Sequence, residues 1–217
     1  MGRYLLFVMG NSIKSTYPPV SVVIPILNEA DHLQAAVDTV LSQEYLGEIE
    51  VILAIGPSRD GTEKVAEEIA RKDNRVRIVL NPSGRTPNAL NIALATATHD
   101  IVVRIDGHSE IAPTYIANVV ETMQRTGAVN VGGIMAAEGI TPFQKAVARA
   151  MRSVIGVGAS RFHTGGNEGA ADTVYLGTFY KPAVSAVGGY DEEFTRAQDW
   201  EMNYRLRQAG GLVYFDP

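Results

Sequence analysis

The sequence predicts a single α/β domain built on a mostly parallel, doubly wound sheet with helices on both faces. The first observation is a rhythm, in which β-branched apolar runs alternate four times with amphipathic segments joined by short links. The second is the run from Ile101 to Ile105, which is nearly continuous rather than alternating, as expected of a strand covered on both faces. The third is size, since 217 residues with 46% apolar composition suffice for one large core.

The first half of the chain repeats one unit, a strand followed by a helix. The strands are rich in Val and Ile, and the helices carry apolar stripes, such as Leu33, Val37 and Val40 in the first. Asn28 is a favourable N-cap for that helix, and Pro87 suits the first turn of the third. Strands are expected over residues 20–27, 49–55, 76–80, 101–105 and 129–134, with helices after 28 and over 63–71, 86–97 and 113–125.

After residue 134 this rhythm is lost. A helix is expected over 142–157, with Phe143, Val147 and Val154 among the residues of its apolar face. The next stretch, 158–172, is glycine-rich and polar and is expected to be a loop. A strand over 174–180, helices over 182–187 and 198–209, and a last strand over 212–215 complete the chain.

Composition excludes several classes of protein. The net charge of −5 argues against a general nucleic-acid-binding surface. The absence of cysteine excludes a disulfide framework and cysteine-based catalysis. The apolar run over residues 4–9 is too short to cross a bilayer, so we expect a loose arm over 1–19 and one domain over 20–217. The abrupt end after a strand suggests a fragment of a longer protein.

Asp106 and His108 directly follow the strand expected over 101–105 and are the first candidate site. In open α/β sheets, ligands collect beyond the carboxyl ends of the strands. A carboxylate and an imidazole two residues apart can share one divalent metal, and Gly107 between them permits close approach. The alternative is a plain Asp-Gly turn with a surface histidine.

Two helix starts are further candidates. Arg85, beside Gly84 at the start of a helix, would offer backbone N–H groups and a guanidinium to an anion, unless it is simply a solvated side chain. Asp199 could act as a general base with Trp200 as an apolar wall, while Glu201 would point elsewhere on the helix. The alternative is that both acids only complement the helix dipole.

Two weaker candidates lie in the second half of the chain. The glycine-rich loop 163–172 could move as a lid and His163 could add a metal ligand, but a mobile surface connection is the more ordinary interpretation. Lys145, Arg149 and Arg152 share a face of the helix from Pro142 and could meet anionic lipid headgroups or a lipid-linked phosphate. A solvated helix face is the alternative.

Five segments of the chain carry a family pattern. They are Val20-Ser-Val-Val-Ile-Pro-Ile-Leu-Asn28-Glu29, Asp60-Gly61-Thr62, Gly84-Arg85-Thr-Pro-Asn-Ala-Leu-Asn91, Asp106-Gly-His108, and Gly188-Gly189-Tyr190-Asp191-Glu192 followed by Gln198-Asp199-Trp200-Glu201. In this order they resemble the inverting glycosyltransferases of family 2, which have the GT-A nucleotide-sugar-binding fold. The pattern, with His108 in place of the second metal-binding Asp, is most similar to the ExoA-type branch of exopolysaccharide glycosyltransferases, whose members usually continue into membrane helices.

The resemblance implies transfer of a sugar, with inversion, from a nucleotide diphosphate donor, expected to be a UDP-sugar, to a glycan or lipid-linked acceptor. It implies Asp199 as the catalytic base, and Asp106 with His108 as ligands of a divalent metal, Mn²⁺ rather than Mg²⁺. The implied donor-binding residues are Pro25, Asn28, Glu29, Ser58, Asp60, Arg85 and Asp106. The implied acceptor-binding residues are Gly177, Thr178, Gln198 and Trp200. The implied location is the cytoplasmic face of the cytoplasmic membrane, with possible contact to its surface.

Two departures from the family pattern keep alternatives open. The stretch Ile55-Gly56-Pro57-Ser58 stands where the family usually has Asp-Asp-Gly-Ser, one acid of which contacts the nucleotide base. The acid motif reads Gln198-Asp199 rather than Glu-Asp. A sugar-nucleotide nucleotidyltransferase, although the chain lacks its glycine-rich N-terminal loop, and a non-catalytic nucleotide-sugar-binding domain are the competing hypotheses.

Overall fold

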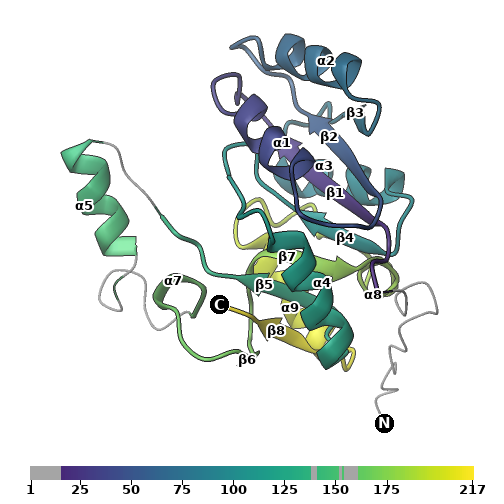
Figure 1. Cartoon of the computed structure of the whole chain (residues 1–217), viewed down its shortest axis with the longest axis vertical. Helices are drawn as coiled ribbons and strands as arrows, with labels where there is room; N and C mark the ends of the chain where they lie inside the picture. Colours follow the sequence, from purple (N-terminus) through teal and green to yellow (C-terminus); the bar gives the residue numbers. More distant parts are fainter. Residues whose placement is uncertain (1–15, 138–140, 152, 154–160) are drawn as a thin grey trace.

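The computed structural model describes residues 16–137, 141–151, 153 and 161–217. These residues form one mixed sheet of eight strands in the order β3-β2-β1-β4-β7-β5-β8-β6, flanked by helices (Figure 1). Most of the expected arm over 1–19, together with Arg152 and Val154, lies outside the described residues.

The first half of the sheet is parallel, as the alternating pattern predicts. The paired strands β2, β1 and β4 form its centre, and β3 lies at one edge. All four strands end at the same edge of the sheet, where a ligand is expected. The elements are β1 Val20–Ile26, α1 Leu33–Leu41, β2 Ile49–Ile55, α2 Thr62–Lys72, β3 Val76–Leu80, α3 Thr86–Thr96, β4 Ile101–Arg104 and α4 Tyr115–Thr126.

The second half of the sheet is mixed. Strand β7 (Tyr175–Tyr180) lies between β4 and β5 (Asn130–Gly133) and is antiparallel to both, so β5 does not pair with β4 as a simple continuation of the rhythm would suggest. Strand β8 (Val213–Phe215) is parallel to β5. The remaining elements are α5 Pro142–Met151, α7 Arg161–Thr164, β6 Gly169–Ala170, α8 Lys181–Ala186 and α9 Gln198–Gln208. The stretch 158–172 is therefore not all loop, because α7 and β6 lie within it.

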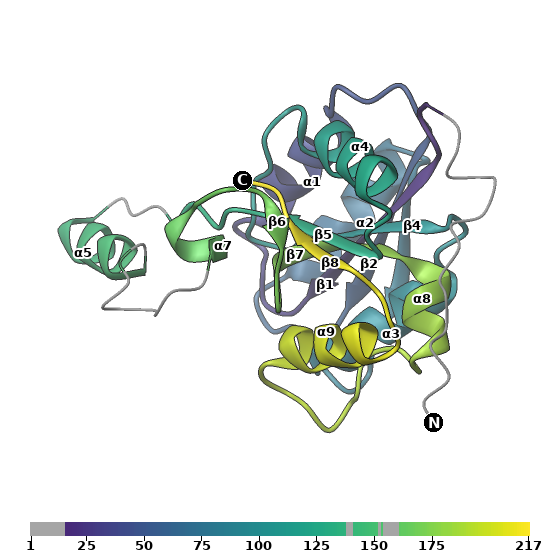
Figure 2. The same cartoon turned by 90° about the horizontal axis from the view of Figure 1, so that it is seen from below.

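Helices cover both faces of the sheet, which explains why most residues of the central strands are apolar. Viewed along the sheet, α1 and α4 lie on one side, and α3, α8 and α9 on the other (Figure 2). Strand β1 is buried at six of seven positions and β4 at all four. One continuous core of buried aliphatic residues runs through these layers.

The link between β1 and α1 differs from the prediction. Asn28 does not cap α1, which begins only at Leu33 after a turn over residues 29–32. Asn28 instead has a left-handed backbone (φ 57°), a conformation that Asn tolerates better than most residues. Pro25 is the sixth of the seven residues of β1, near the carboxyl end of the strand and opposite Ala54 of β2.

Helix α5 also departs from expectation. It ends at Met151, and its predicted apolar face is exposed rather than packed, with Phe143 at 78% and Val147 at 42% of full exposure. Figure 1 shows why, because α5 projects from the body of the molecule. Lys145 and Arg149 on this helix are exposed. Helical periodicity correctly predicted the helix, but periodicity cannot say whether a partner covers the apolar stripe.

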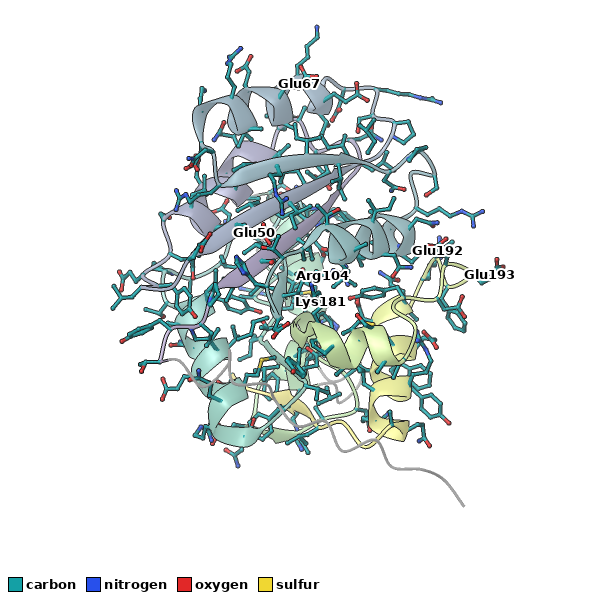
Figure 3. All side chains as sticks on the ribbon, turned by 90° about the vertical axis from the view of Figure 1, so that its right-hand side faces the viewer. Glu50, Glu67, Arg104, Lys181, Glu192 and Glu193 are labelled. Carbon is teal, nitrogen blue, oxygen red and sulfur yellow. The ribbon has the colours of Figure 1, made fainter. Side chains whose placement is uncertain are left out.

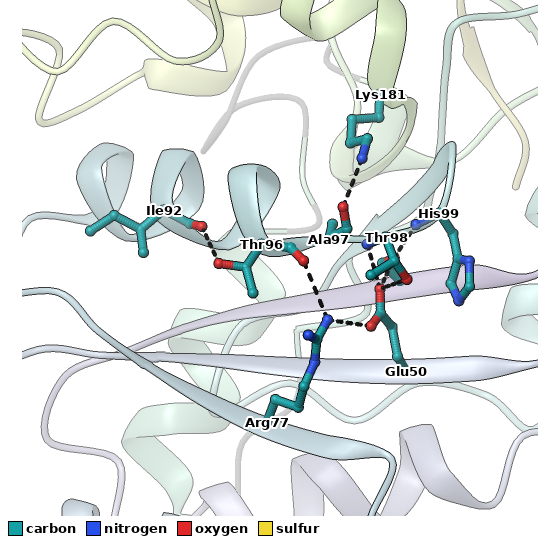
Figure 4. A network of polar contacts seen from close by, with 9 residues as sticks. Glu50, Arg77, Ile92, Thr96, Ala97, Thr98, His99 and Lys181 are labelled. Atoms are coloured by element: carbon teal, nitrogen blue, oxygen red, sulfur yellow. Dashed lines mark hydrogen bonds and ion pairs between the residues drawn. The ribbon is translucent and has the colours of Figure 1, made fainter.

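A network of polar contacts joins strands and helices near the amino ends of the parallel strands, opposite the carboxyl ends where a ligand is expected (Figure 4). Glu50 on β2 accepts hydrogen bonds from Ser21 Oγ (2.5 Å), Thr98 N (2.7 Å) and Thr98 Oγ1 (2.8 Å), and pairs with Arg77 of β3 (2.5 Å). Lys181 Nζ donates to the carbonyl of Ala97 at 2.7 Å, which ties α8 to the same region. Because these residues cross-link β1, β2, β3 and the segment before β4, they fix the relative positions of the strands that carry the site.

Candidate functional site

The loops after β1 and β2 are bonded together at the carboxyl edge. Asn28 N donates to Ser58 Oγ (3.0 Å), and Asn28 Oδ1 accepts from Arg59 N (2.8 Å). Asp60 Oδ2 accepts from Ala30 N (3.0 Å), and its Oδ1 accepts from Thr62. Four of the predicted donor-binding residues, Asn28, Glu29, Ser58 and Asp60, therefore lie on two adjoining loops.

Asp60 already forms hydrogen bonds within the protein that stabilise these loops. Hydrogen bonds from Thr62 and from the backbone of Ala30 lower the pKa of this carboxyl, so it stays ionised at neutral pH. Both of its oxygens already accept protein hydrogen bonds. Asp60 thus tethers the β1–α1 loop to the start of α2 before any ligand is considered.

The loop after β3 closes against these two loops at Gly56. A Cβ at Gly56 would lie 3.1 Å from Leu27 Cδ1, 3.2 Å from Gly84 Cα and 3.3 Å from the Ile26 carbonyl. A side chain at position 56 would therefore require these neighbours to shift. Arg85 begins α3 beside this contact, with its side chain exposed and its backbone N–H bonded to Ser83 Oγ (3.1 Å).

The end of β4 and the start of α9 meet at a buried arginine. Arg104 Nη2 lies 3.0 Å and Nε 3.3 Å from Asp106 Oδ1, while Nη1 donates to Asp199 Oδ1. The Arg104 side chain is only 6% exposed and lies inside the molecule (Figure 3). The two carboxylates that the sequence singled out, although far apart along the chain, thus share one guanidinium.

The charges of this cluster reinforce one another. Burial opposes the charge on Arg104, but attraction from Asp199 and Asp106 raises the pKa of its guanidinium well above the usual range. Tyr190 is packed beside the cluster, where burial and the negative charge of Asp199 raise the pKa of its hydroxyl well above the usual range. Arg104 therefore stays a cation and Tyr190 a neutral phenol, so the cluster keeps a fixed charge pattern.

His108 pairs with a residue of the opposite loop. Its Nδ1 lies 2.8 Å from Glu29 Oε1, and its side chain is 57% exposed. Gly107 makes this approach possible, because a Cβ there would lie 3.0 Å from Glu29 Cγ. With Nδ1 engaged, Nε2 is the nitrogen left for a ligand, the arrangement in which a carboxylate orients a metal-binding imidazole.

Helix α9 is anchored so that Asp199 faces the cluster. Asn203, one turn further along, accepts from Asn130 Nδ2 of β5 at 2.6 Å in the core. Glu201 binds Arg205 through two short contacts (2.5 and 2.6 Å), which leaves it as a structural partner rather than a second catalytic acid. Ala197, just before the helix, has a left-handed backbone (φ 56°), a strained conformation of the kind found next to active sites.

Residues of the Gly84-to-Asn91 motif form hydrogen bonds with the segment that precedes α9. Asn91 Nδ2 donates to the Tyr190 carbonyl and Asn91 Oδ1 accepts from Tyr190 N, both at 2.8 Å. Glu192 accepts from Asn91 (3.1 Å) and from Asn88. Helix α3 therefore holds Tyr190, and with it the wall of the charged cluster.

The residues predicted to bind an acceptor divide into two pairs. Gly177 and Thr178 lie within β7 and are buried, and Gly177 is packed so closely that a Cβ there would lie 2.4 Å from Asn130 Oδ1. The Thr178 side chain is 0% exposed, so neither residue is accessible to a ligand in this structure. Gln198 and Trp200 lie at the start of α9, where Trp200 is 52% exposed and stacks on Tyr204. A cavity of about 1100 Å³ opens beside His108 and Ser109 and extends along α4.

His163 is not brought into a metal cluster. It lies on α7 with its ring against Phe162 (4.3 Å between centroids), and burial lowers its pKa. Within the described part of the chain, no three His, Asp or Glu side chains are grouped to hold a metal ion. A metal at Asp106 and His108 would therefore need other ligands from water or substrate.

Arg104 is the site residue that the sequence reasoning missed. The signal was present, since Arg104 is the one charge inside the apolar run from Ile101 to Ile105. In a strand, residues two apart face the same side, so Arg104 and Asp106 had to share a face. A charge inside a strand covered on both faces requires a partner, and that requirement pointed to a buried acid.

Solved structures establish the class of fold. The mannosyltransferase PcManGT from Pyrobaculum calidifontis, solved with GDP-Man and Mn²⁺, superimposes with a TM-score of 0.68 at 21% identity, covering 91% of this chain and 54% of its own. TarS from S. aureus, solved with UDP, gives a TM-score of 0.65 at 16% identity, covering 91% of this chain and 60% of its own. The fold is thus the GT-A fold, as the sequence predicts.

Sequence comparison then identifies the family. Residues 21–184 match the model of glycosyl transferase family 2, and the chain belongs to that family. It is 37% identical over 195 residues to the succinoglycan biosynthesis protein ExoA of Rhizobium meliloti, which covers 89% of this chain and 59% of that protein. It is 26% identical over 208 residues to the dolichyl N-acetyl-alpha-D-glucosaminyl phosphate 3-beta-D-2,3-diacetamido-2,3-dideoxy-beta-D-glucuronosyltransferase of Methanococcus voltae, covering 91% of this chain and 64% of that protein. The chain thus spans about three fifths of the length of these two relatives.

Proposed function

We propose that this chain is the donor-binding and catalytic domain of an inverting glycosyltransferase that moves a sugar from a nucleotide diphosphate to a hydroxyl of a glycan or lipid-linked acceptor in polysaccharide biosynthesis. The observation that carries the proposal is the joining of Asp106 and Asp199 at the carboxyl edge of the sheet through Arg104. A single displacement needs a base at the attacking hydroxyl, the role proposed for Asp199, and positive charge at the departing diphosphate, which Asp106 would help to supply by holding a divalent cation. Names of the relatives, which refer to succinoglycan biosynthesis and glycosyl transfer, support the same reaction class.

The donor would lie over the loops that follow β1, β2 and β3. Pro25, Asn28, Glu29, Ser58 and Asp60 surround the place proposed for the base. Arg85 is proposed to meet the diphosphate, because it is exposed at the start of α3 and forms no ion pair with a described residue. Uridine is the proposed base of the donor nucleotide, and the donor screen described below tests this choice.

Asp106 and His108 fit a divalent cation. Asp106 Oδ1 is engaged by Arg104, while Oδ2 forms no hydrogen bond or ion pair with a described residue. Glu29 engages Nδ1 of the exposed His108 side chain, which leaves Nε2 for a ligand. Mixed carboxylate and imidazole donors favour Mn²⁺ over Mg²⁺, which prefers oxygen ligands alone. When bound, such an ion would supply positive charge to the departing diphosphate. The Mn²⁺ in the solved mannosyltransferase is consistent with this choice.

Asp199 is proposed as the general base. The acceptor oxygen forms a bond to the anomeric carbon while the bond from that carbon to the diphosphate oxygen breaks. The hydroxyl proton passes to Asp199, and the electron pair leaves with the diphosphate. Gln198 and Trp200 at the same helix start, and the cavity beside His108, are the proposed contacts of the acceptor. Buried Gly177 and Thr178 could take part only through movement of β7.

The site of action is proposed to be the cytoplasmic face of the cytoplasmic membrane. Helix α5 supports contact with a membrane surface, since it exposes Phe143 and Val147 together with Lys145 and Arg149. In the described residues no helix is both long enough and apolar enough to cross a bilayer.

The deciding experiment is a donor screen followed by a transfer assay. Nucleotide sugars that bind with Mn²⁺ or Mg²⁺ will raise the melting temperature, and their transfer or hydrolysis is then measured. Asp199→Asn should lower kcat by about 10²- to 10⁴-fold while the thermal shift with donor is retained. Glu193→Gln, an exposed acid on the preceding loop, is the matched control and should transfer normally.

Each alternative predicts a different result. Near-normal turnover by Asp199→Asn would refute the assignment of the base. Binding without transfer or hydrolysis under either metal would favour the non-catalytic domain, a hypothesis motivated by the acids that are absent at Ile55 and Gly56. Pyrophosphate release from a nucleoside triphosphate would favour a nucleotidyltransferase, and no feature seen among the described residues singles out that reaction.

A further inference from the structure

Arg104 is a buried arginine shared by two acids from separate segments, and its role goes beyond charge balance. Its side chain is 6% exposed, while those of Asp106 and Asp199 are 19% and 32% exposed. The cation is therefore the most deeply covered member of the cluster, with an acid on each side that reaches toward solvent. Interior strand positions of this kind are otherwise apolar in β4.

The guanidinium connects the two acids through different nitrogens. Nε and Nη2 face Asp106, and Nη1 faces Asp199. These nitrogens are fixed in one plane, so a guanidinium that holds two carboxylates also fixes their separation. A lysine in the same place would supply the charge but not the fork.

Neither acid is placed by its own backbone alone. Asp106 follows the end of β4, and Asp199 lies in the first turn of α9 after the strained Ala197. Among the contacts of the described residues, those through Arg104 are the ones that link these two positions directly. The spacing between the acids therefore depends on this side chain.

We propose that Arg104 is a positioning residue that sets the distance between the acid at the leaving-group side and the acid that activates the attacking hydroxyl. The inference rests on the function proposed above. In-line displacement demands that the breaking and forming bonds lie on opposite sides of one carbon, so the two acids must be correctly spaced. A misplacement of about 1 Å can cost about 100-fold in rate.

The test is Arg104→Lys, which keeps the charge and removes the fork. We expect kcat to fall about 100-fold, while donor KM and the affinity for Mn²⁺ with UDP, measured by titration calorimetry, change by less than about threefold. Arg77→Lys is the matched control, since Arg77 also pairs with an acid, Glu50, but at the opposite edge of the sheet (Figure 4). It should leave kcat unchanged.

A double variant separates positioning from general support of the fold. If Arg104 acts through Asp199, then Arg104→Lys added to Asp199→Asn should cause little further loss of kcat, because the base is already gone. If the losses of kcat in the two single variants multiply in the double variant, the proposal is overturned. A normal kcat in Arg104→Lys would also overturn it, and so would a loss of Mn²⁺ affinity in parallel with the loss of kcat.

A second variant serves if Arg104→Lys does not fold. Asp199→Glu keeps Arg104 and both charges but moves the base by one methylene at a partly exposed helix start. The proposal expects a kcat about 100-fold lower with unchanged donor KM, and a normal kcat would overturn it. A wild-type protein that transfers no sugar from any donor would instead contradict the proposed function itself.

Discussion

Glu50 gives the sharpest test of what holds the strand framework together. Substituting Gln keeps the size of the side chain but removes its charge. In the structure, Oε1 accepts three hydrogen bonds from Ser21 and Thr98, and Oε2 pairs with Arg77. The amide oxygen of Gln can replace Oε1, but its NH₂ group would then face the guanidinium.

The expected loss follows from these contacts. Hydrogen bonds to a charged acceptor contribute about 1.5–3 kcal/mol each, against about 0.5–1.5 for neutral ones, so three weakened bonds cost up to about 3 kcal/mol. The half-exposed pair with Arg77 adds up to about 1 kcal/mol. Because the bonds share one acceptor and solvent screens part of the group, we expect about 2 kcal/mol in total. That corresponds to a melting temperature about 4–8 °C lower for a domain of this size.

The pH dependence supplies an independent check. Burial raises the pKa of Glu50, but hydrogen bonds from Ser21 and Thr98 and the charge of Arg77 outweigh it, so the pKa is lowered overall. A lowered native pKa means that the stabilisation is present above the unfolded pKa of about 4.3 and is lost as pH falls through the native pKa. The stability gap between wild type and Glu50→Gln should therefore be full at pH 7 and shrink below about pH 4.

Urea unfolding at several pH values measures this gap. Glu67→Gln on the exposed face of α2, labelled in Figure 3, is the control and should change the free energy of unfolding by less than about 0.5 kcal/mol. A gap that stays constant down to acid pH, or that grows there, would refute the reasoning.

Three further predictions concern the site itself. His108→Ala should weaken Mn²⁺ binding about 10- to 100-fold in titration calorimetry, and unchanged affinity would exclude His108 as a ligand. Asn91→Leu should lower the free energy of unfolding, measured in urea, by about 2–3 kcal/mol and should also lower kcat, because the backbone N–H and carbonyl of Tyr190 lose their hydrogen bonds to Asn91. If both the free energy of unfolding and kcat are unchanged, the contact is dispensable. Ala197→Gly should raise the free energy of unfolding by up to about 1 kcal/mol, since glycine adopts the left-handed backbone without strain, and a clear decrease would contradict that cause.

The order of strands and helices in the first half of the sheet was predictable because each strand there follows a local rule. Continuous Val and Ile runs predicted strands buried on both faces, and β1, β2 and β4 are such strands. The insertion of β7 between β4 and β5 was not predictable in this way. No local pattern in residues 175–180 states which neighbours the strand will pair with, because pairing depends on contacts made across the whole chain.

The candidate site was predicted in its parts but not in its connections. Asp106, His108 and Asp199 could be proposed as candidates from the sequence because each follows a strand end or begins a helix. Their partners were hidden, since Glu29 reaches His108 and Arg104 reaches Asp199 from segments 79 and 95 residues away. The predicted acceptor contacts Gly177 and Thr178 illustrate the same limit, because their place inside the sheet follows from the pairing of β7 with β4 and β5.

The sequence by itself determined the fold class, the family resemblance and the positions of the acids, because periodicity and motif order are properties of neighbouring residues. Only the tertiary structure decided that Arg104 bridges two acids, that Asn91 supports Tyr190 and that the apolar face of α5 is left uncovered. The physical reason is that a side chain's partners are set by strand pairing and helix packing. One charge inside an apolar strand shows that a partner must exist, and the fold decides which residue it is.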